Sequence, residues 1–222
     1  MTHVHVHGGP APAAEGHVTP SWRLLATLGT AGALAGLLVA VVYDWTITPI
    51  EAHRGAVMQL AIAEVLQHPA RWDTLYMEGG KLVTRPAGAA AELPRVFQGY
   101  DGSGRRIGVA VLAAEPGFTE VISLIFGFEP ESSRLLGMKV LDEKETPGLG
   151  DKIEKDSSFV RQFARAIAPL KGVKSRSPSD LAEVDVISGA TISSRAVIRI
   201  INNAVARWRP LLVAYHGAGT TQ

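Results

Sequence analysis

The sequence predicts an α+β domain that follows a single N-terminal transmembrane helix. Two observations lead to this fold class: a long uncharged apolar run near the N-terminus, and short strand-like segments followed by helices without a regular βαβ alternation. The chain has 222 residues, enough for one domain of ordinary size and an appendage. With 46% hydrophobic and 19% charged residues, it is too apolar for a disordered chain.

The composition also excludes several classes of function. Basic and acidic side chains nearly balance, at 22 against 21, so the sequence indicates no basic surface and we expect no nucleic-acid partner. Cysteine is absent. This excludes disulfides, cysteine-ligated iron–sulfur clusters and a cysteine nucleophile within the chain.

Residues 1–21 form the first segment, which we expect to be a flexible tail. The alternating histidines His3, His5 and His7 lie there among glycines and prolines, a composition that cannot build a core. Such histidines can bind a transition metal weakly, but no carboxylate or further histidine follows at ligand spacing. We therefore expect no metal site.

Residues 22–45 are predicted to form the transmembrane helix. Residues 24–43 carry no charge, and about 20 such residues cross the roughly 30 Å hydrocarbon core of a bilayer. Trp22, Tyr43 and Trp45 lie at the two ends, as in the aromatic belts of membrane helices. A cleaved signal peptide is the alternative, but its apolar part is usually only about 7–15 residues long, and no small-residue cleavage site follows.

The remaining residues, 46–222, are predicted to form one α+β domain. Apolar residues at helical spacing predict helices over residues 56–67, 157–170 and 192–208, the last with Val197, Ile201 and Trp208 on its apolar face. Turn residues separate several segments with strand character. The predicted strands are 81–85, 95–100, 106–113, 120–127, 135–141 and 184–187. Residues 101–104 are predicted to be a hairpin turn.

A junction of small and hydroxyl residues, Ser188-Gly189-Ala190-Thr191-Ile192-Ser193, joins the last predicted strand to the last helix. Such a strand-to-helix junction suits a phosphate, because the first backbone N–H groups of a helix lack intrahelical partners and lie at the positive end of its dipole. Gly189 and Ala190 allow an anion to approach the backbone. The simpler alternative is that Thr191 or Ser193 is only the N-cap of the helix.

A second motif, the nonapeptide ETPGLGDKI, spans residues 145–153. One proline and two glycines form a turn in which the backbone can come close to a planar or bulky group. Taken alone, this segment is typical of an ordinary turn.

Together, ETPGLGDKI and the SGATISS sequence about 40 residues later resemble the G subunit of the Rnf electron-transport complex. The chain is more distantly similar to the C subunit of the sodium-translocating NADH:quinone reductase. The resemblance covers essentially the whole chain past residue 20. One departure is visible: the family often has a histidine two residues before the motif's glutamate, where this chain has Glu143.

The resemblance implies a covalent FMN, joined through its phosphate to the hydroxyl of Thr191. Ser188, Gly189, Ala190 and Ser193 would line the phosphate. The ETPGLG turn would lie against the flavin. The residues implied there are Glu145, Thr146, Pro147, Gly148, Leu149, Gly150 and Lys152.

The resemblance also implies the function and the location. The chain would be a membrane-anchored flavoprotein that relays electrons in a ferredoxin:NAD oxidoreductase coupled to ion translocation, with no catalytic residue of its own. Its partners would be the other membrane and soluble subunits, membrane lipid, and the flavin transferase that attaches FMN. The flavin domain would lie on the periplasmic side of the bacterial inner membrane.

Two alternatives remain open at the level of sequence. One is a membrane-tethered flavin-binding regulatory or sensory module, although such proteins usually carry further spans and cysteine clusters. The other is a structural membrane subunit in which SGATISS only caps a helix. The second alternative predicts a colourless protein.

Overall fold

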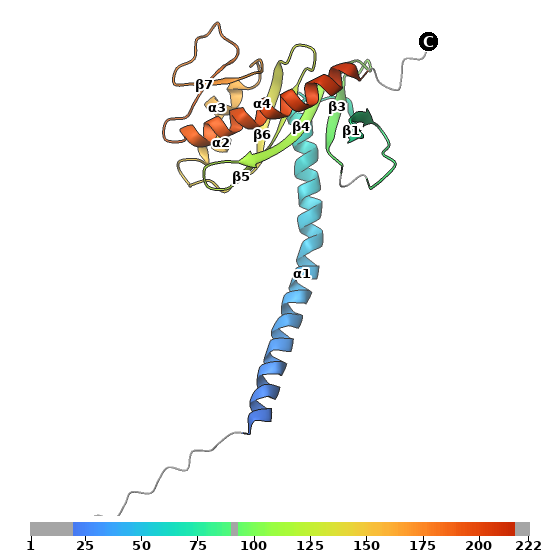
Figure 1. Ribbon diagram of the computed structural model, residues 1–222, viewed down its shortest axis with the longest axis vertical. Coiled ribbons are helices and arrows are strands. Elements are labelled where there is room, and N and C mark those ends of the chain that lie inside the picture. The colour runs from blue at the N-terminus through green and yellow to red at the C-terminus, as the bar shows by residue number, and fades with distance from the viewer. Residues whose placement is uncertain (1–19, 90–92, 216–222) are drawn as a thin grey trace, which may run out of the picture. The chain divides into compact units, whose positions relative to one another are not determined.

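The computed structural model describes residues 20–89 and 93–215 of the chain (Figure 1). The chain divides into two compact units, Met1–Arg54 and Gly55–Gln222. The predicted tail lies outside the described residues except for its last two, Pro20 and Ser21.

Apart from Pro20, the described part of the N-terminal unit belongs to helix α1 (Ser21–Val65). Within it, Ser21–Ile47 has a mean hydropathy of 2.1 and is long and apolar enough to cross a membrane. The hydroxyls of Thr27, Thr30 and Thr46 donate to carbonyls of the preceding turn, at 3.0, 2.8 and 2.6 Å. These bonds satisfy polar groups that would be costly in lipid. The predicted N-terminal apolar helix is therefore confirmed.

The C-terminal unit is built on a six-stranded antiparallel sheet with strand order β2-β1-β3-β4-β5-β6. Its strands are β1 (Arg71–Glu78), β2 (Lys81–Val83), β3 (Arg95–Tyr100), β4 (Arg106–Pro116), β5 (Val121–Phe128) and β6 (Leu135–Asp142). The later elements are α2 (Lys152–Lys155), α3 (Ser157–Gln162), the short parallel strands β7 (Lys171–Val173) and β8 (Glu183–Asp185), and α4 (Thr191–Ala214). Helices and a mainly antiparallel sheet confirm the predicted α+β class.

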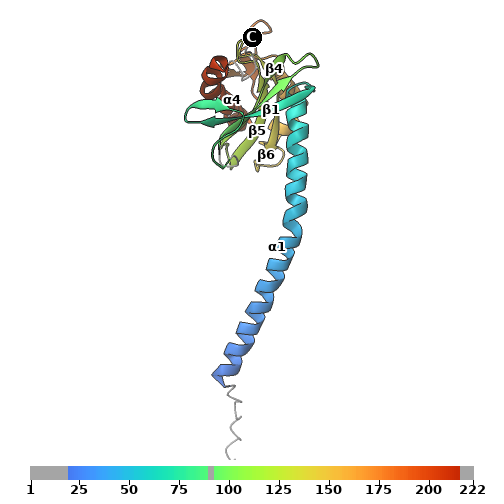
Figure 2. The same cartoon turned by 90° about the vertical axis from the view of Figure 1, so that its right-hand side faces the viewer.

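Helices cover both faces of the sheet (Figure 2). Alternate strand residues point to opposite faces, so Val109 and Val111 of β4 pack with α4, whereas Ala110 packs with the end of α1. The predicted apolar face of α4 is buried as expected, including Val197, Ile201 and Trp208. This packing fixes the start of α4 near the ends of the central strands.

The last turn of α1 lies directly against the backbone of β5. A Cβ added at Gly127 would collide with the carbonyl oxygen of Val65 and lie 2.9 Å from its carbonyl carbon. Only glycine therefore permits this approach. The side chain of Gln67 then bonds the Leu136 carbonyl at 3.0 Å, which ties the helix end to β6.

Several predicted boundaries were wrong, and tertiary contacts explain the largest difference. The predicted helix 157–170 ends at Gln162, and the chain beyond it is used for pairing: Ala168 N–H donates to Ser133 and Leu170 N–H donates to Asn202. Helix α4 continues to Ala214 through Pro210, six residues past the predicted end. Strands β1 and β7 and helix α2 were not predicted.

Candidate functional site

The two sequence motifs meet in the folded chain. The hydroxyl of Ser193 donates to Oε2 of Glu145 at 2.7 Å, across 48 residues of sequence. A Cβ added at Gly150 would lie 2.7 Å from that same oxygen, and one added at Gly189 would lie 3.5 Å from Cδ2 of Leu149. The ETPGLG turn therefore packs on the strand-to-helix junction without space for a side chain at Gly150.

Glu145 also holds a third segment, the turn between β4 and β5. Its Oε1 accepts from the backbone N–H groups of Phe118 and Thr119, at 2.9 and 3.0 Å. The carboxyl side chain is buried, and a Cβ at Gly117 would collide with Oε1. One carboxylate thus ties together three segments that are distant in sequence.

Opposing effects act on the pKa of Glu145. Burial raises it, but hydrogen bonds from the Ser193 hydroxyl and from the backbone N–H groups of Thr119, Phe118 and Glu120 outweigh burial and lower the pKa below its ordinary value. Glu145 is therefore ionised at neutral pH, and its negative charge is distributed over these donors.

Neighbouring carboxylates hold the two ends of the turn. Glu143, the residue that departs from the family pattern, accepts the backbone N–H of Glu145 at 2.6 Å. At the other end, Lys155 donates to Asp151 at 2.7 Å, and this bond is the main cause of the lowered Asp151 pKa. Gly148 adopts φ +77°, a left-handed conformation that suits glycine.

The strand-to-helix junction carries no side-chain cap. Ala190 is the N-cap residue of α4 and makes no side-chain hydrogen bond. The Ser193 hydroxyl is engaged by Glu145, and the Ser194 hydroxyl accepts from the Ile187 N–H at 3.1 Å. The alternative in which Thr191 or Ser193 serves as the N-cap is therefore wrong.

Thr191 stands at the open end of this junction. Its side chain is half-buried, and its hydroxyl makes no hydrogen bond to any residue in the described ranges. Ser188 and Gly189 beside it are both exposed, and Gly189 has φ +83°, which a side chain would oppose. The first N–H groups of α4 and the free hydroxyl together fit a phosphoester.

Exposed apolar side chains lie on each of the three segments that meet at the junction. The chain has six phenylalanines; five are buried, whereas Phe118 is 64% exposed. Leu149 and Ile192 are also exposed, at 48% and 57%. Since Glu145 ties the backbone of Phe118 to Ser193, these side chains offer an apolar surface of the kind that a flavin ring covers.

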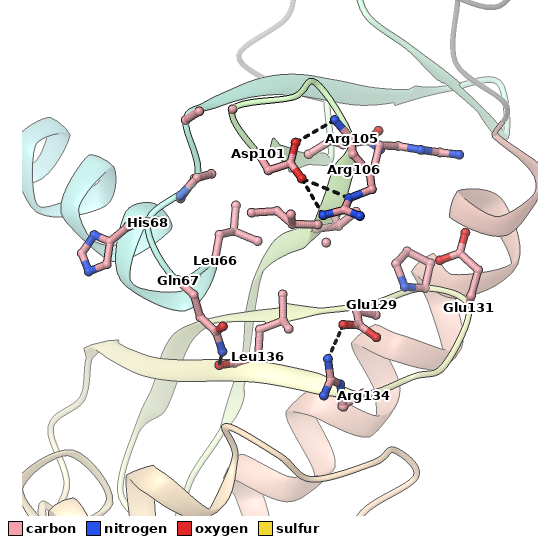
Figure 3. Close-up of a pocket in the computed structure, with 18 residues that line it drawn as sticks. Leu66, Gln67, His68, Asp101, Arg105, Arg106, Glu129, Glu131, Arg134 and Leu136 are labelled. Carbon is pink, nitrogen blue, oxygen red and sulfur yellow. Dashed lines mark hydrogen bonds and ion pairs between the residues drawn. The ribbon is translucent and has the colours of Figure 1, made fainter.

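A larger and a smaller cavity lie among the described residues of the C-terminal unit, and the smaller one adjoins the motifs. The larger, about 810 Å³, is lined by residues of the α1 end, the β3–β4 turn and the β5–β6 turn. Figure 3 shows the ion pairs Asp101–Arg105 and Glu129–Arg134 on its facing walls. Neither motif contributes to its lining. The smaller, about 500 Å³, is lined by Lys152 and Ser188 among others.

Comparison with known proteins agrees with this geometry. Residues 117–206 match the model of the FMN-binding domain family. The match begins at Gly117, in the turn that Glu145 holds, and ends within α4. It therefore includes all three segments that meet at the candidate site.

Sequence similarity to known proteins extends over most of the chain. The G subunit of an ion-translocating oxidoreductase complex from Pseudoalteromonas atlantica is 31% identical over 173 residues, which cover 75% of this chain and 78% of the relative. The chain belongs to the family of G subunits of ion-translocating oxidoreductase complexes. Another such G subunit, from Methanosarcina acetivorans, is 27% identical over 183 residues, covering 82% of this chain and 92% of the relative. Family membership confirms the resemblance and favours an electron-transfer subunit over a regulatory module.

Solved structures share the fold of this chain. The crystal structure of NqrC from Shewanella oneidensis aligns with a TM-score of 0.61 at 18% identity, covering 74% of this chain and all of that chain. The C subunit of the Na⁺-translocating NADH-quinone reductase from Parabacteroides distasonis aligns with a TM-score of 0.55, also at 18% identity, covering 70% of this chain and 91% of that chain. At this level of identity, the two alignments show a shared fold only.

The structure brings most of the predicted site residues together. Glu145, Leu149 and Gly150 contact or closely approach the strand-to-helix junction, whereas Thr146, Pro147 and Gly148 are exposed on the outer part of the turn. The prediction missed the loop at residues 117–119. The signal that could have found it is an apolar aromatic residue directly after Glu-Pro-Gly, a position where a simple turn needs none.

Proposed function

We propose that the chain is the electron-carrying flavoprotein subunit of its complex, with FMN joined through its phosphate to the hydroxyl of Thr191. The observation that carries the proposal is this hydroxyl without a hydrogen-bond partner among the described residues, at the uncapped start of α4 and framed by the ETPGLG turn. FMN would supply the redox chemistry, since it can accept and donate electrons.

The residues around Thr191 would then bind and orient the cofactor. The N–H groups of the first turn face the phosphoester charge, and Ser188, Gly189, Ala190 and Ser193 line it. The helix dipole contributes only about 0.3–1 kcal/mol, too little to hold a flavin in dilute solution, so the covalent bond would keep it in place. Phe118, Leu149 and Ile192 would exclude water from one side of the ring.

Attachment requires a partner enzyme. A flavin transferase using FAD would break the pyrophosphate bond, form a P–O bond to the Thr191 oxygen and release AMP, while the hydroxyl proton passes to a base of the transferase. Electrons would enter and leave through other subunits of the complex. The Ser21–Ile47 helix would anchor the chain in lipid, with the flavin domain on the periplasmic side.

The test is a mass measurement on the full chain produced together with a flavin transferase. The wild type should gain the mass of one FMN minus one water, and its denatured gel band should fluoresce. Thr191→Ala should lose both signals, whereas Thr191→Ser restores a hydroxyl and should recover them in part. Flavin that persists in Thr191→Ala would place the ester elsewhere.

A further inference from the structure

The smaller cavity continues the strand-to-helix junction on its strand side. It has a volume of about 500 Å³, within the range of small-molecule sites. Its walls come from α2, α3, the loop after β7 and the segment after β8, and they include Lys152, Arg176 and Ser188. Ser188 precedes Thr191 by only three residues. A group tethered to Thr191 can therefore enter this cavity.

The carboxylates of the cavity are already engaged. Asp156 accepts from the N–H and the hydroxyl of Ser158, at 2.8 and 2.6 Å, where it caps α3. Asp185 accepts the Arg176 N–H at 2.5 Å and lies 3.9 Å from the Arg176 guanidinium. Both acidic groups thus have donors of their own.

Lys152 differs from the neighbouring Lys155 in having no ion-pair partner among the described residues. Lys155, on the same short helix, pairs with Asp151 at 2.7 Å. Lys152 is half-buried at the cavity wall, and no ion pair or side-chain hydrogen bond joins it to any described residue. Its charge acts on the nearby carboxylates of Asp151 and Asp156, but no hydrogen bond fixes its ammonium group, which can therefore reach a ligand in the cavity.

We propose that this cavity takes the polar edge of the flavin ring and that Lys152 places its ammonium group beside that edge. This inference rests on the proposed function. Adding two electrons and one proton to the ring leaves it with one negative charge, which a nearby cation stabilises. Lys152 therefore raises the reduction potential of the bound flavin.

The experiment compares reduction potentials of the flavin-loaded full chain in detergent. Each variant is titrated anaerobically with dithionite against a reference dye, and its covalent FMN content is measured by mass. Lys152→Gln should weaken the stabilisation of the reduced form about tenfold, a fall of about 30 mV for a two-electron couple. Lys155→Gln is the matched control: it removes the same charge from the same helix and should shift the potential by less than a third as much.

Two further variants test the direction of the shift in reduction potential and control for misfolding. Lys152→Arg keeps the charge and should retain a potential near that of the wild type. Asp156→Asn removes a negative charge from the cavity wall while still able to cap α3, and should raise the potential.

The possible failures are distinguishable. Wild-type protein without covalent FMN would overturn the proposed function itself. Lys152→Gln with full FMN content and an unchanged potential would overturn only the role of Lys152. Loss of covalent FMN in Lys152→Gln but not in Lys152→Arg would also overturn the proposed effect on the reduction potential. The charge of Lys152 would then be needed for the attachment of FMN.

Discussion

Replacing Glu145 by glutamine tests the carboxylate that ties three segments of the site together. Glutamine keeps the shape of the side chain but removes its charge. Its amide oxygen can still accept from the N–H groups of Phe118 and Thr119, and its amide nitrogen can donate to the Ser193 hydroxyl, which then acts as an acceptor. The variant should therefore fold with the same contacts, each of them weaker.

The expected loss follows from the number of hydrogen bonds. Bonds to a charged group contribute about 1.5–3 kcal/mol, and neutral bonds about 0.5–1.5 kcal/mol, so three bonds give up about 3 kcal/mol in total. Part of this is returned because a buried neutral amide costs less to desolvate than a carboxylate. We expect a net fall in the free energy of unfolding of about 1–2 kcal/mol, or about 2–8 °C in melting temperature.

Thermal unfolding of the detergent-solubilised chain, followed by circular dichroism, measures this loss. Glu120→Gln is the matched control, because it makes the same chemical change on the same turn at a solvent-exposed side chain. It should alter the unfolding free energy by less than about 0.5 kcal/mol. Equal melting temperatures for the two variants would refute a stabilising role of the Glu145 carboxylate.

The pH dependence gives a second check on Glu145. Since folding lowers its pKa, the ionised form contributes stability above the ordinary glutamate value of 4.5, and this contribution is lost as the pH falls below it. The melting temperature of the wild type should therefore fall more steeply than that of Glu145→Gln on acidification. Parallel curves would contradict the lowered pKa.

Two glycine substitutions test the close approaches in the domain. Gly150→Ala would place a Cβ 2.6 Å from the Cβ of Glu145. We therefore expect chemical denaturation to show a loss of unfolding free energy of about 1–3 kcal/mol. The control is Gly102→Ala, where the added Cβ meets open space and should cost no more than about 0.5 kcal/mol. Gly127→Ala would push a Cβ into the backbone of Val65, and should cost at least as much and increase hydrogen exchange in the last turn of α1. Wild-type stability in either variant would contradict the corresponding contact.

Much of the fold could be predicted because its signals are local. The apolar face of α4 follows helical spacing, and the strands from β3 to β6 are short runs bounded by turn residues. Strand β1 was missed because its alternation is weak: only Leu75 is fully buried, and most of its neighbours are half-buried. The overlong helix at 157–170 failed because residues beyond Gln162 form hydrogen bonds to segments that periodicity cannot reveal.

In the candidate site, too, local sequence signals could be predicted and contacts between distant segments could not. Thr191 and the ETPGLG turn could be named from sequence because each carries small, turn-forming residues in a specific order. Their meeting through Glu145 and Ser193 is a contact over 48 residues, which no local pattern determines. The loop around Phe118 was missed for the same reason, since its role depends on a carboxylate 27 residues away.

The contact of Val65 with Gly127 determines where a water-soluble fragment of this protein can begin. Ala61, Ile62, Val65 and Leu66 cover one apolar face of the sheet, where they pack on Phe97, Ile125 and Leu136. A truncation that starts at β1 would leave that face bare and prone to aggregation. Truncation between Arg54 and Gly55 keeps the final turns of α1 packed on the sheet and removes the apolar helix Ser21–Ile47.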